Sequence, residues 1–201
     1  MTLTLSQMAA SVTMDQANLH GAEESALAVR FGREEPGAFE EVVTVYQQRV
    51  ARLASRLLGW DADVDDVVQD VFLAALTGAR GFGGKASLWT WLTTITLNRC
   101  RRHLRRRALW KRFWAVAQNS ALHSAPASDA PAVGSELSRR VRDAVSALPP
   151  RDREIVVLFH LEGRSAEEVG QITGDTANAV QIRLHRARGK LSGTLAPLAR
   201  E

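Results

Sequence analysis

The sequence predicts an all-α protein in which two small helical domains are joined by a flexible linker. Apolar residues recur at three- and four-residue spacing in both halves of the 201-residue chain, and there is no sustained apolar–polar alternation of the kind that predicts β-strands. Between residues 115 and 135 the composition turns to Ala, Ser and Pro with few apolar anchors, which is typical of a flexible linker. We therefore expect an N-terminal tail over 1–23, a first helical domain over 24–114, a linker over 115–135 and a second helical domain over 136–201.

The charge of the chain is distributed in patches. The isoelectric point is about 10.0 although the net charge is only +4, so basic and acidic residues are both abundant. This balance suits a protein whose basic faces meet nucleic acid and whose acidic face meets another protein.

The first candidate binding element is an acidic helix that begins near Asp61. Residues 61–72 contain five aspartates and no basic residue. A 3.6-residue period gathers the apolar side chains on one arc, formed by Val64, Val67, Val68, Val71, Phe72 and Ala75. Leu73 falls on the acidic side, and an apolar residue within an acidic face is typical of a protein-docking surface. A well-capped surface helix explains the same acids equally well, since negative charge near a helix start complements its dipole.

The second element follows two tryptophans, Trp89 and Trp91. Residues 99–112 contain eight arginines and lysines and no acid. Interleaved cations and aromatic rings suit the phosphates and unpaired bases of single-stranded or opening DNA. Trp91, Leu92 and Ile95 also lie at core spacing, so we favour the core for the tryptophans and nucleic acid for the arginines.

The third element is a helix-turn-helix at the C-terminus. A helix is expected to follow Leu148-Pro149-Pro150 and to end at Gly163. Ser165 and Glu168 have the spacing of a capping box, which predicts the start of a second helix. After a turn over residues 173–175, a third helix is predicted from an apolar stripe of Val180, Leu184, Ala187 and Leu191.

The third helix has the layout of a recognition helix. Asn178, Gln181, Ile182 and His185 project away from its apolar stripe, and three arginines flank them: Arg183, Arg186 and Arg188. Amide side chains pair with base edges in the major groove, and arginines hold phosphates. The alternative is a helical hairpin with a solvated basic face.

The chain offers little for catalysis, and we expect no catalytic residue, metal site or cofactor. No phosphate-binding glycine loop, nucleophile elbow or His-Glu metal motif is present, and His160 and His185 are expected at the surface or in a DNA groove. The single cysteine, Cys100, could contribute with His103 only half of a metal or redox site. With neither a signal peptide nor a membrane-length apolar run, we expect a cytoplasmic protein without membrane insertion.

Taken together, these segments resemble the extracytoplasmic-function (ECF) group of sigma-70-family transcription initiation factors. The stretches Asp65–Leu76, Gly83–Asn98 and His103–Arg107 are similar to region 2 of that family, within residues 35–112. Leu148–Glu154 and Leu184–Arg188 are similar to region 4, within residues 137–192.

The resemblance implies an alternative sigma factor that directs core RNA polymerase to promoters, often in stress responses, and helps to open the minus-ten element. Its partners would be the β′ clamp helices and β flap of the polymerase, promoter DNA as duplex and as melted strand, and an anti-sigma factor. A stand-alone helix-turn-helix regulator, which would dimerise on palindromic half-sites, is the main alternative. A nucleic-acid-processing enzyme ranks lower, because the acids of residues 61–70 alternate with valines instead of converging.

The resemblance also implies three sets of contact residues. Polymerase binding is assigned to Asp65, Asp66, Gln69, Asp70 and Leu73. Minus-ten DNA binding is assigned to Lys85, Ser87, Trp89, Asn98, Arg101, Arg102 and Arg105. Minus-thirty-five DNA binding is assigned to Thr176, Asn178, Ala179, Gln181, Ile182, Arg183, His185 and Arg186. The chain departs from the family at Lys85, at Arg102 and in the recognition helix, so its promoter sequence cannot be copied from a relative.

Overall fold

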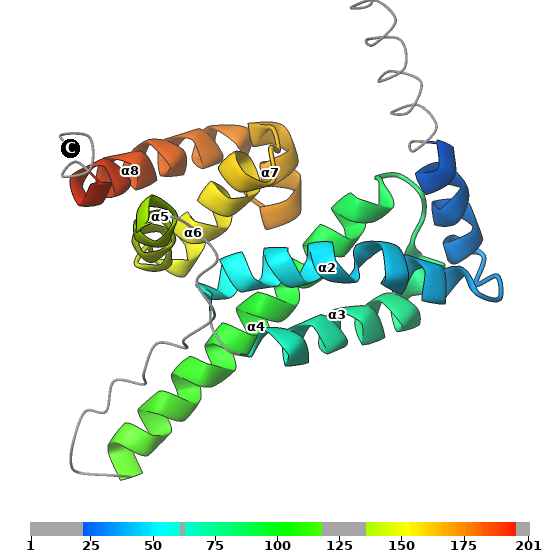
Figure 1. Ribbon diagram of the computed structural model, residues 1–201, viewed down its shortest axis with the longest axis horizontal. Coiled ribbons are helices and arrows are strands. Elements are labelled where there is room, and N and C mark those ends of the chain that lie inside the picture. Colours follow the sequence, from blue (N-terminus) through cyan, green and yellow to red (C-terminus); the bar gives the residue numbers. More distant parts are fainter. Residues whose placement is uncertain (1–21, 61–62, 118–135, 196–201) are drawn as a thin grey trace, which may run out of the picture.

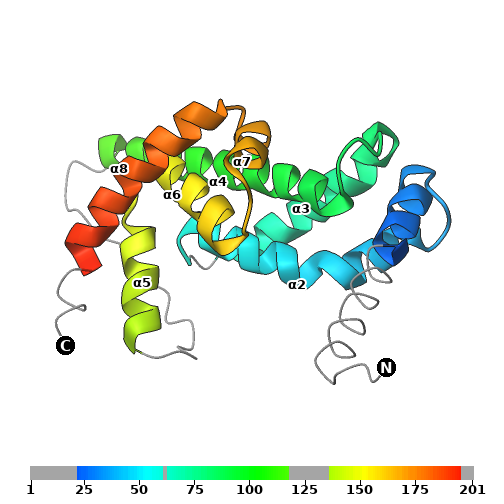
Figure 2. The ribbon, with the colours of Figure 1, turned by 90° about the horizontal axis from the view of Figure 1, so that it is seen from above.

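A computed structural model describes residues 22–60, 63–117 and 136–195, and its regular elements over those ranges are all helical. They form two bundles that lie side by side (Figures 1 and 2). The all-α, two-domain prediction is confirmed for this part of the chain.

The first bundle is built from α2 (Ala38–Leu58), α3 (Val64–Gly78) and α4 (Leu88–Ala117), which pack on one another. A helix over residues 22–32 precedes them, and a short 3-10 turn, η1 (Ala79–Gly81), follows α3. The centre of the bundle is filled by apolar side chains that water does not reach, among them Phe31, Leu53, Val71, Leu92 and Leu97. Burial of this kind is the main stabilising term of such a bundle.

Helix α4 continues past residue 114, where the linker was expected to begin. Residues 115–117, expected to begin the linker, continue the helix, and residues 22–23 of the expected tail are helical as well. Residues 118–135 of the expected linker and 1–21 of the expected tail lie outside the described residues. The second half of α4 projects away from the bundle to which its first half belongs (Figure 1).

The second bundle contains α5 (Glu136–Ser146), α6 (Pro150–Val156), a π-helical turn η2 (Val157–Leu161), α7 (Ala166–Thr173) and α8 (Ala177–Leu195). The predicted helix before Gly163 is present, with its last part π-helical, and Gly163 follows it with a φ of 67°. After Val156 the helix changes from α to π, in which each N–H bonds to the carbonyl five residues earlier. The N–H of Glu162, for example, donates to the carbonyl of Val157 at 3.0 Å. In this π-helical turn Val157 and Leu158 are buried and His160 is exposed.

The two bundles are joined by polar contacts at the ends of α2 and along α4. Arg101 of α4 makes a two-pronged ion pair with buried Glu154 of α6, at 2.8 and 3.0 Å. Arg56 of α2 pairs with Glu162 at 2.8 Å. Arg153 is buried and donates to the carbonyl of Leu57 at 3.4 Å. The structure therefore holds the second bundle against the first.

Candidate polymerase and nucleic-acid interfaces

Helix α3 separates its apolar and acidic residues. Val67, Val71, Phe72 and Ala75 are buried against the bundle. The five residues assigned to polymerase binding are all exposed on the other side: Asp65, Asp66, Gln69, Asp70 and Leu73. We call these five residues the acidic docking face.

The acidic docking face contains more apolar surface than the sequence analysis recognised. Leu73 is 54% exposed, and Leu76, one helical turn further on, is 47% exposed. Leu76 could have been found from its position three residues after Leu73, a spacing that places two side chains on one helical face. Asp65 and Asp66 lie in the first turn, where they also stabilise the helix dipole, so the two explanations of these acids are compatible.

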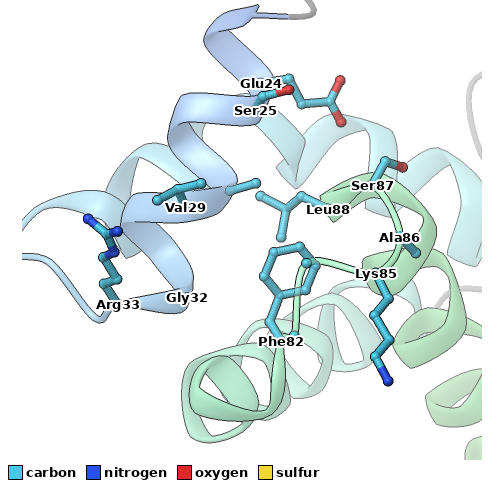
Figure 3. Close-up of a pocket in the computed structure, with 13 residues that line it drawn as sticks. Glu24, Ser25, Val29, Gly32, Arg33, Phe82, Lys85, Ala86, Ser87 and Leu88 are labelled. Carbon is cyan, nitrogen blue, oxygen red and sulfur yellow. The ribbon is translucent and has the colours of Figure 1, made fainter.

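A cavity of about 720 Å³ opens between the helix over residues 22–32 and the loop that precedes α4. Figure 3 shows Phe82 and Leu88 lying close together in it, with Val29 on the neighbouring helix and Glu24 and Ser87 nearer its edge. Its lining is mixed: Ala28, Val29, Phe82 and Leu88 supply apolar surface, and Glu24, Arg33, Lys85 and Ser87 supply charged and polar groups, a combination that can contact an organic ring and its polar substituents. We call this space the loop cavity.

The aromatic wall of the loop cavity is held in place from behind. The ring of Phe82 lies 5.3 Å from that of Trp91 and 6.2 Å from that of Phe31, in tilted and edge-on geometries. Phe31 and Trp91 are themselves 5.7 Å apart. Such edge contacts fix ring orientation, so the cavity has a preformed wall.

Two residues assigned to minus-ten DNA, Lys85 and Ser87, line the loop cavity and are exposed. Ser87 has a structural role too, because its hydroxyl accepts from the N–H of Thr90 at 3.1 Å and caps α4. The helix over residues 22–32 also contributes to the cavity, which the sequence did not predict, and supplies Glu24, Val29 and Arg33. That helix precedes the segment of family resemblance, so no motif pointed to it.

The prediction that Trp89 contacts DNA is wrong. Its side chain is only 3% exposed, its ring stacks on that of Tyr46 at 6.1 Å, and the Arg49 guanidinium lies 4.0 Å above it. Burial also raises the pKa of the Tyr46 phenol. Trp89 therefore belongs to the core. The core spacing of this segment had favoured that position for its tryptophans.

Four other residues assigned to the minus-ten element lie on α4, and they differ in whether they are accessible to DNA. Asn98, Arg102 and Arg105 are exposed. Arg101 is engaged by Glu154, and its guanidinium also donates to the carbonyl of Thr173 at 3.4 Å. In this arrangement of the bundles, Arg101 is not available to a phosphate, which corrects the expectation for that residue.

The second bundle contains the helix-turn-helix that the sequence predicted. The capping box is present: the Glu168 N–H donates to the Ser165 hydroxyl at 3.2 Å, and the Ser165 N–H to the Glu168 carboxylate at 2.9 Å. These bonds hold the pKa of Glu168 below its usual value. Helix α7 then passes close to the turn, since a Cβ on Gly170 would lie only 2.7 Å from the Asp175 carbonyl oxygen.

The expected face of the recognition helix α8 is open to solvent. Val180, Leu184 and Ala187 are buried. Six of the residues assigned to minus-thirty-five DNA are exposed: Thr176, Asn178, Gln181, Ile182, His185 and Arg186. Ala179 and Arg183 are half-buried at the edge of that face, and Thr176 caps the helix by accepting from the Ala179 N–H at 3.2 Å.

Cys100 and His103 do not form a metal-binding pair in this structure. Cys100 is buried, and burial together with nearby Glu154 raises its pKa to about 12. His103 lies 3.1 Å from Asp63. Within the described ranges, no group of three or more His, Cys, Asp and Glu side chains has the arrangement of a metal site. No helix of the described part is long and apolar enough to cross a membrane.

An acidic docking face, a preformed cavity beside a basic helix, and a helix-turn-helix together define a two-domain transcription protein that binds both protein and DNA. Comparison with known families makes this specific. Residues 42–109 match the model of Sigma-70 region 2, and residues 138–191 match that of Sigma-70 region 4. The chain belongs to the sigma-70 family, in its ECF group.

Similar proteins cover nearly the whole chain. It is 30% identical to an ECF RNA polymerase sigma-E factor of Haemophilus influenzae, over 87% of this chain and 96% of that protein. It is 32% identical to RNA polymerase sigma factor CarQ of Myxococcus xanthus, over 82% and 92%. A solved structure of CnrH in complex with the cytosolic domain of CnrY matches with a TM-score of 0.62 and 30% identity, over 87% of this chain and 97% of CnrH.

These matches establish the function at the level of the family. The protein is an ECF sigma factor, which directs RNA polymerase to promoters at transcription initiation. Region 2 and region 4 both match, in the expected order, and a stand-alone helix-turn-helix regulator is not favoured.

Proposed function

We propose that the acidic docking face binds the β′ clamp helices of core RNA polymerase. The observation that carries this proposal is the pairing of four exposed polar or acidic side chains with exposed Leu73 on one side of α3. Acids steer the encounter with a basic partner, and an exposed leucine supplies the apolar contact that holds it.

We further propose that the loop cavity takes one base of the minus-ten element after it leaves the DNA stack. Opening a base pair costs a few kcal/mol, so a preformed pocket for the extruded base selects sequence and stabilises the melted state together. Asn98, Arg102 and Arg105 on α4 would hold the neighbouring strand, and the exposed face of α8 would read the minus-thirty-five element as duplex. The domain limits belong to the same proposal, with region 2 over residues 24–114 and region 4 over 136–201.

The sigma factor would act in the cytoplasm without catalytic residues or cofactor of its own, since the polymerase performs the chemistry. An anti-sigma factor is a further proposed partner. CnrH is solved with the cytosolic domain of CnrY, and that complex motivates a search for an equivalent partner here. Such a partner would have to cover the acidic docking face or the DNA-facing surfaces to hold the protein inactive.

The deciding experiment replaces Asp66 by arginine and measures binding to core polymerase. We expect Asp66→Arg to weaken binding by about 2 kcal/mol or more, because it places like charges at a charge-complementary interface. Glu40→Arg is the matched control, since Glu40 is also an exposed acid, on α2. Equal affinities of the wild type and Asp66→Arg for core polymerase would refute the docking assignment.

A further inference from the structure

The far end of α4 exposes a group of large apolar side chains that the proposed contacts leave unused. Leu109, Trp110, Phe113 and Trp114 are 64, 57, 68 and 54% exposed. Trp110 and Phe113 contact each other edge-on, with ring centroids 6.4 Å apart. The match to region 2 ends at residue 109, so all three aromatic rings lie beyond it. We call Trp110, Phe113 and Trp114 the terminal aromatic cluster.

One member of this cluster, Phe113, continues the proposed DNA-facing surface of α4, and Trp110 and Trp114 lie further round the helix, past exposed Arg106. Asn98, Arg102, Arg105, Leu109 and Phe113 follow one another at spacings of four, three, four and four residues, and all are exposed. That spacing places them in one row along the helix, on the side away from buried Leu92, Thr96 and Cys100. At 1.5 Å per residue the row is roughly 22 Å long, which is enough to contact several consecutive nucleotides of one strand.

The charge around the row identifies the kind of partner. From residue 88 to residue 117 α4 contains no acid, and it contains eight arginines and lysines between residues 99 and 112. Such a surface complements a polyanion. Flat exposed rings next to arginines are the side chains on which unpaired bases stack, whereas the bases of a duplex already stack on each other.

A membrane surface fits this helix less well. Helices that lie in a bilayer interface separate a charged face from an apolar one. Here Arg102 and Arg105 share a row with Leu109 and Phe113, so inserting the apolar residues would also draw the arginines of the same row toward the apolar layer.

We propose that the terminal aromatic cluster, together with Arg102, Arg105 and Arg106, binds single-stranded DNA by base stacking and phosphate contacts. This site extends the strand-binding surface of region 2 past the loop cavity by about four helical turns. This proposal rests on the proposed function, because the natural ligand would be a promoter strand that the polymerase has opened. The arginines bind the backbone without regard to sequence, and the rings distinguish unpaired from paired bases.

The test uses the full chain and a fluorescent oligo(dT) strand of about 20 nucleotides, with a duplex of equal length for comparison. The variant Trp110→Leu, Phe113→Leu, Trp114→Leu keeps the surface apolar but removes its aromatic faces. We expect its affinity for the single strand to fall about tenfold or more while its affinity for the duplex stays within about twofold, because each base–ring stack is lost only from the single-strand complex. Val45→Ala is the matched control and is expected to leave both affinities nearly unchanged, since it removes an exposed apolar side chain on α2, outside the row on α4.

The other results each contradict the proposal. Failure of the wild type to bind the strand at low ionic strength, an unchanged affinity in the triple variant, or an equal loss on the duplex would overturn it. Loss of binding to phosphatidylglycerol vesicles with intact strand binding would assign the cluster to a membrane instead. Binding of the triple variant to core polymerase is measured in parallel, so that an error in the polymerase assignment is recognised separately.

Discussion

At the scale of single residues, Val29 decides how much room the loop cavity has. It is 52% exposed and it lines the cavity from the helix over residues 22–32 (Figure 3). A larger side chain at this position would fill space proposed for a base without removing any core contact. The position therefore separates base capture from folding and from polymerase binding.

We predict that Val29→Trp lowers open-complex formation about tenfold or more while binding to core polymerase is unchanged. The added ring competes with the extruded base for the cavity, and the cost of opening the base pair is then no longer offset. Open complexes are measured by permanganate reactivity of promoter thymines. Val45→Trp is the control, because Val45 of α2 is 56% exposed and does not line the cavity. Normal melting by Val29→Trp would mean that the base binds elsewhere.

At the scale of helices, the start of α7 determines how the helix-turn-helix is held. Ser165 and Glu168 satisfy each other's backbone N–H groups, and Arg164 adds an ion pair to Glu168 at 2.9 Å. These bonds stabilise the ionised carboxylate of Glu168, and its pKa is therefore lowered. The stabilisation is complete above the unfolded-state pKa of a glutamate and is lost as the pH falls through the lower pKa of the folded state.

We predict that Ser165→Ala lowers the free energy of unfolding by about 1 kcal/mol at neutral pH. We also expect the difference in stability between wild type and Glu168→Gln to shrink as the pH falls below about 4. Protonation of Glu168 then makes the wild-type side chain neutral, as the glutamine of the variant already is. Thermal unfolding followed by circular dichroism across that pH range measures both effects. A difference that grows on acidification would contradict the assigned direction of the pKa.

In the recognition helix, different residues are expected to determine base specificity and overall affinity. Asn178 and Gln181 are amides near its start, whereas Arg186 lies further along the same exposed surface. We predict that Asn178→Ala or Gln181→Ala relaxes base preference in the minus-thirty-five element at a cost of about 1–3 kcal/mol for the preferred base. Arg186→Ala is expected to weaken binding to all sequences and to reduce its salt dependence. Competition binding of the polymerase complex to a promoter library tests this, and the opposite pattern would reverse the two roles.

At the scale of the whole molecule, the contacts between the bundles compete with DNA for Arg101. Its partner Glu154 has a side chain only 6% exposed, and the Arg56–Glu162 pair lies alongside on α2. Removing one member of such a pair leaves the other charge without compensation, which favours exposure of that charge to water. The position of region 4 on region 2 therefore depends on these two glutamates.

We predict that Glu154→Gln combined with Glu162→Gln separates the two bundles and increases the radius of gyration measured by X-ray scattering, with little change in helix content. Glu136→Gln is the control, because Glu136 pairs with Arg139 and Arg140 inside α5. An unchanged radius of gyration in the double variant would show that apolar packing alone holds the bundles together.

The sequence by itself determined the helices and most of their exposed faces. The acidic docking face and the open face of α8 followed from a 3.6-residue period, because side chains on an amphipathic helix must turn their apolar side inward whatever the partner helix is. The capping box at Ser165 was equally local, since both of its bonds join residues three positions apart. Family motifs then supplied the functional assignment.

Tertiary structure decided everything that depends on residues far apart in the chain. The loop cavity forms only because the helix over residues 22–32 lies against the loop over residues 82–88. The ion pair between Arg101 and Glu154 joins residues 53 positions apart, and it forms only because the two bundles are in contact. Trp89 and Trp110 show the same limit: both are tryptophans of one arginine-rich helix, yet Trp89 is buried against Tyr46 of α2 while Trp110 is 57% exposed. Periodicity gives the direction of a side chain on its helix, and only packing determines whether another element covers it.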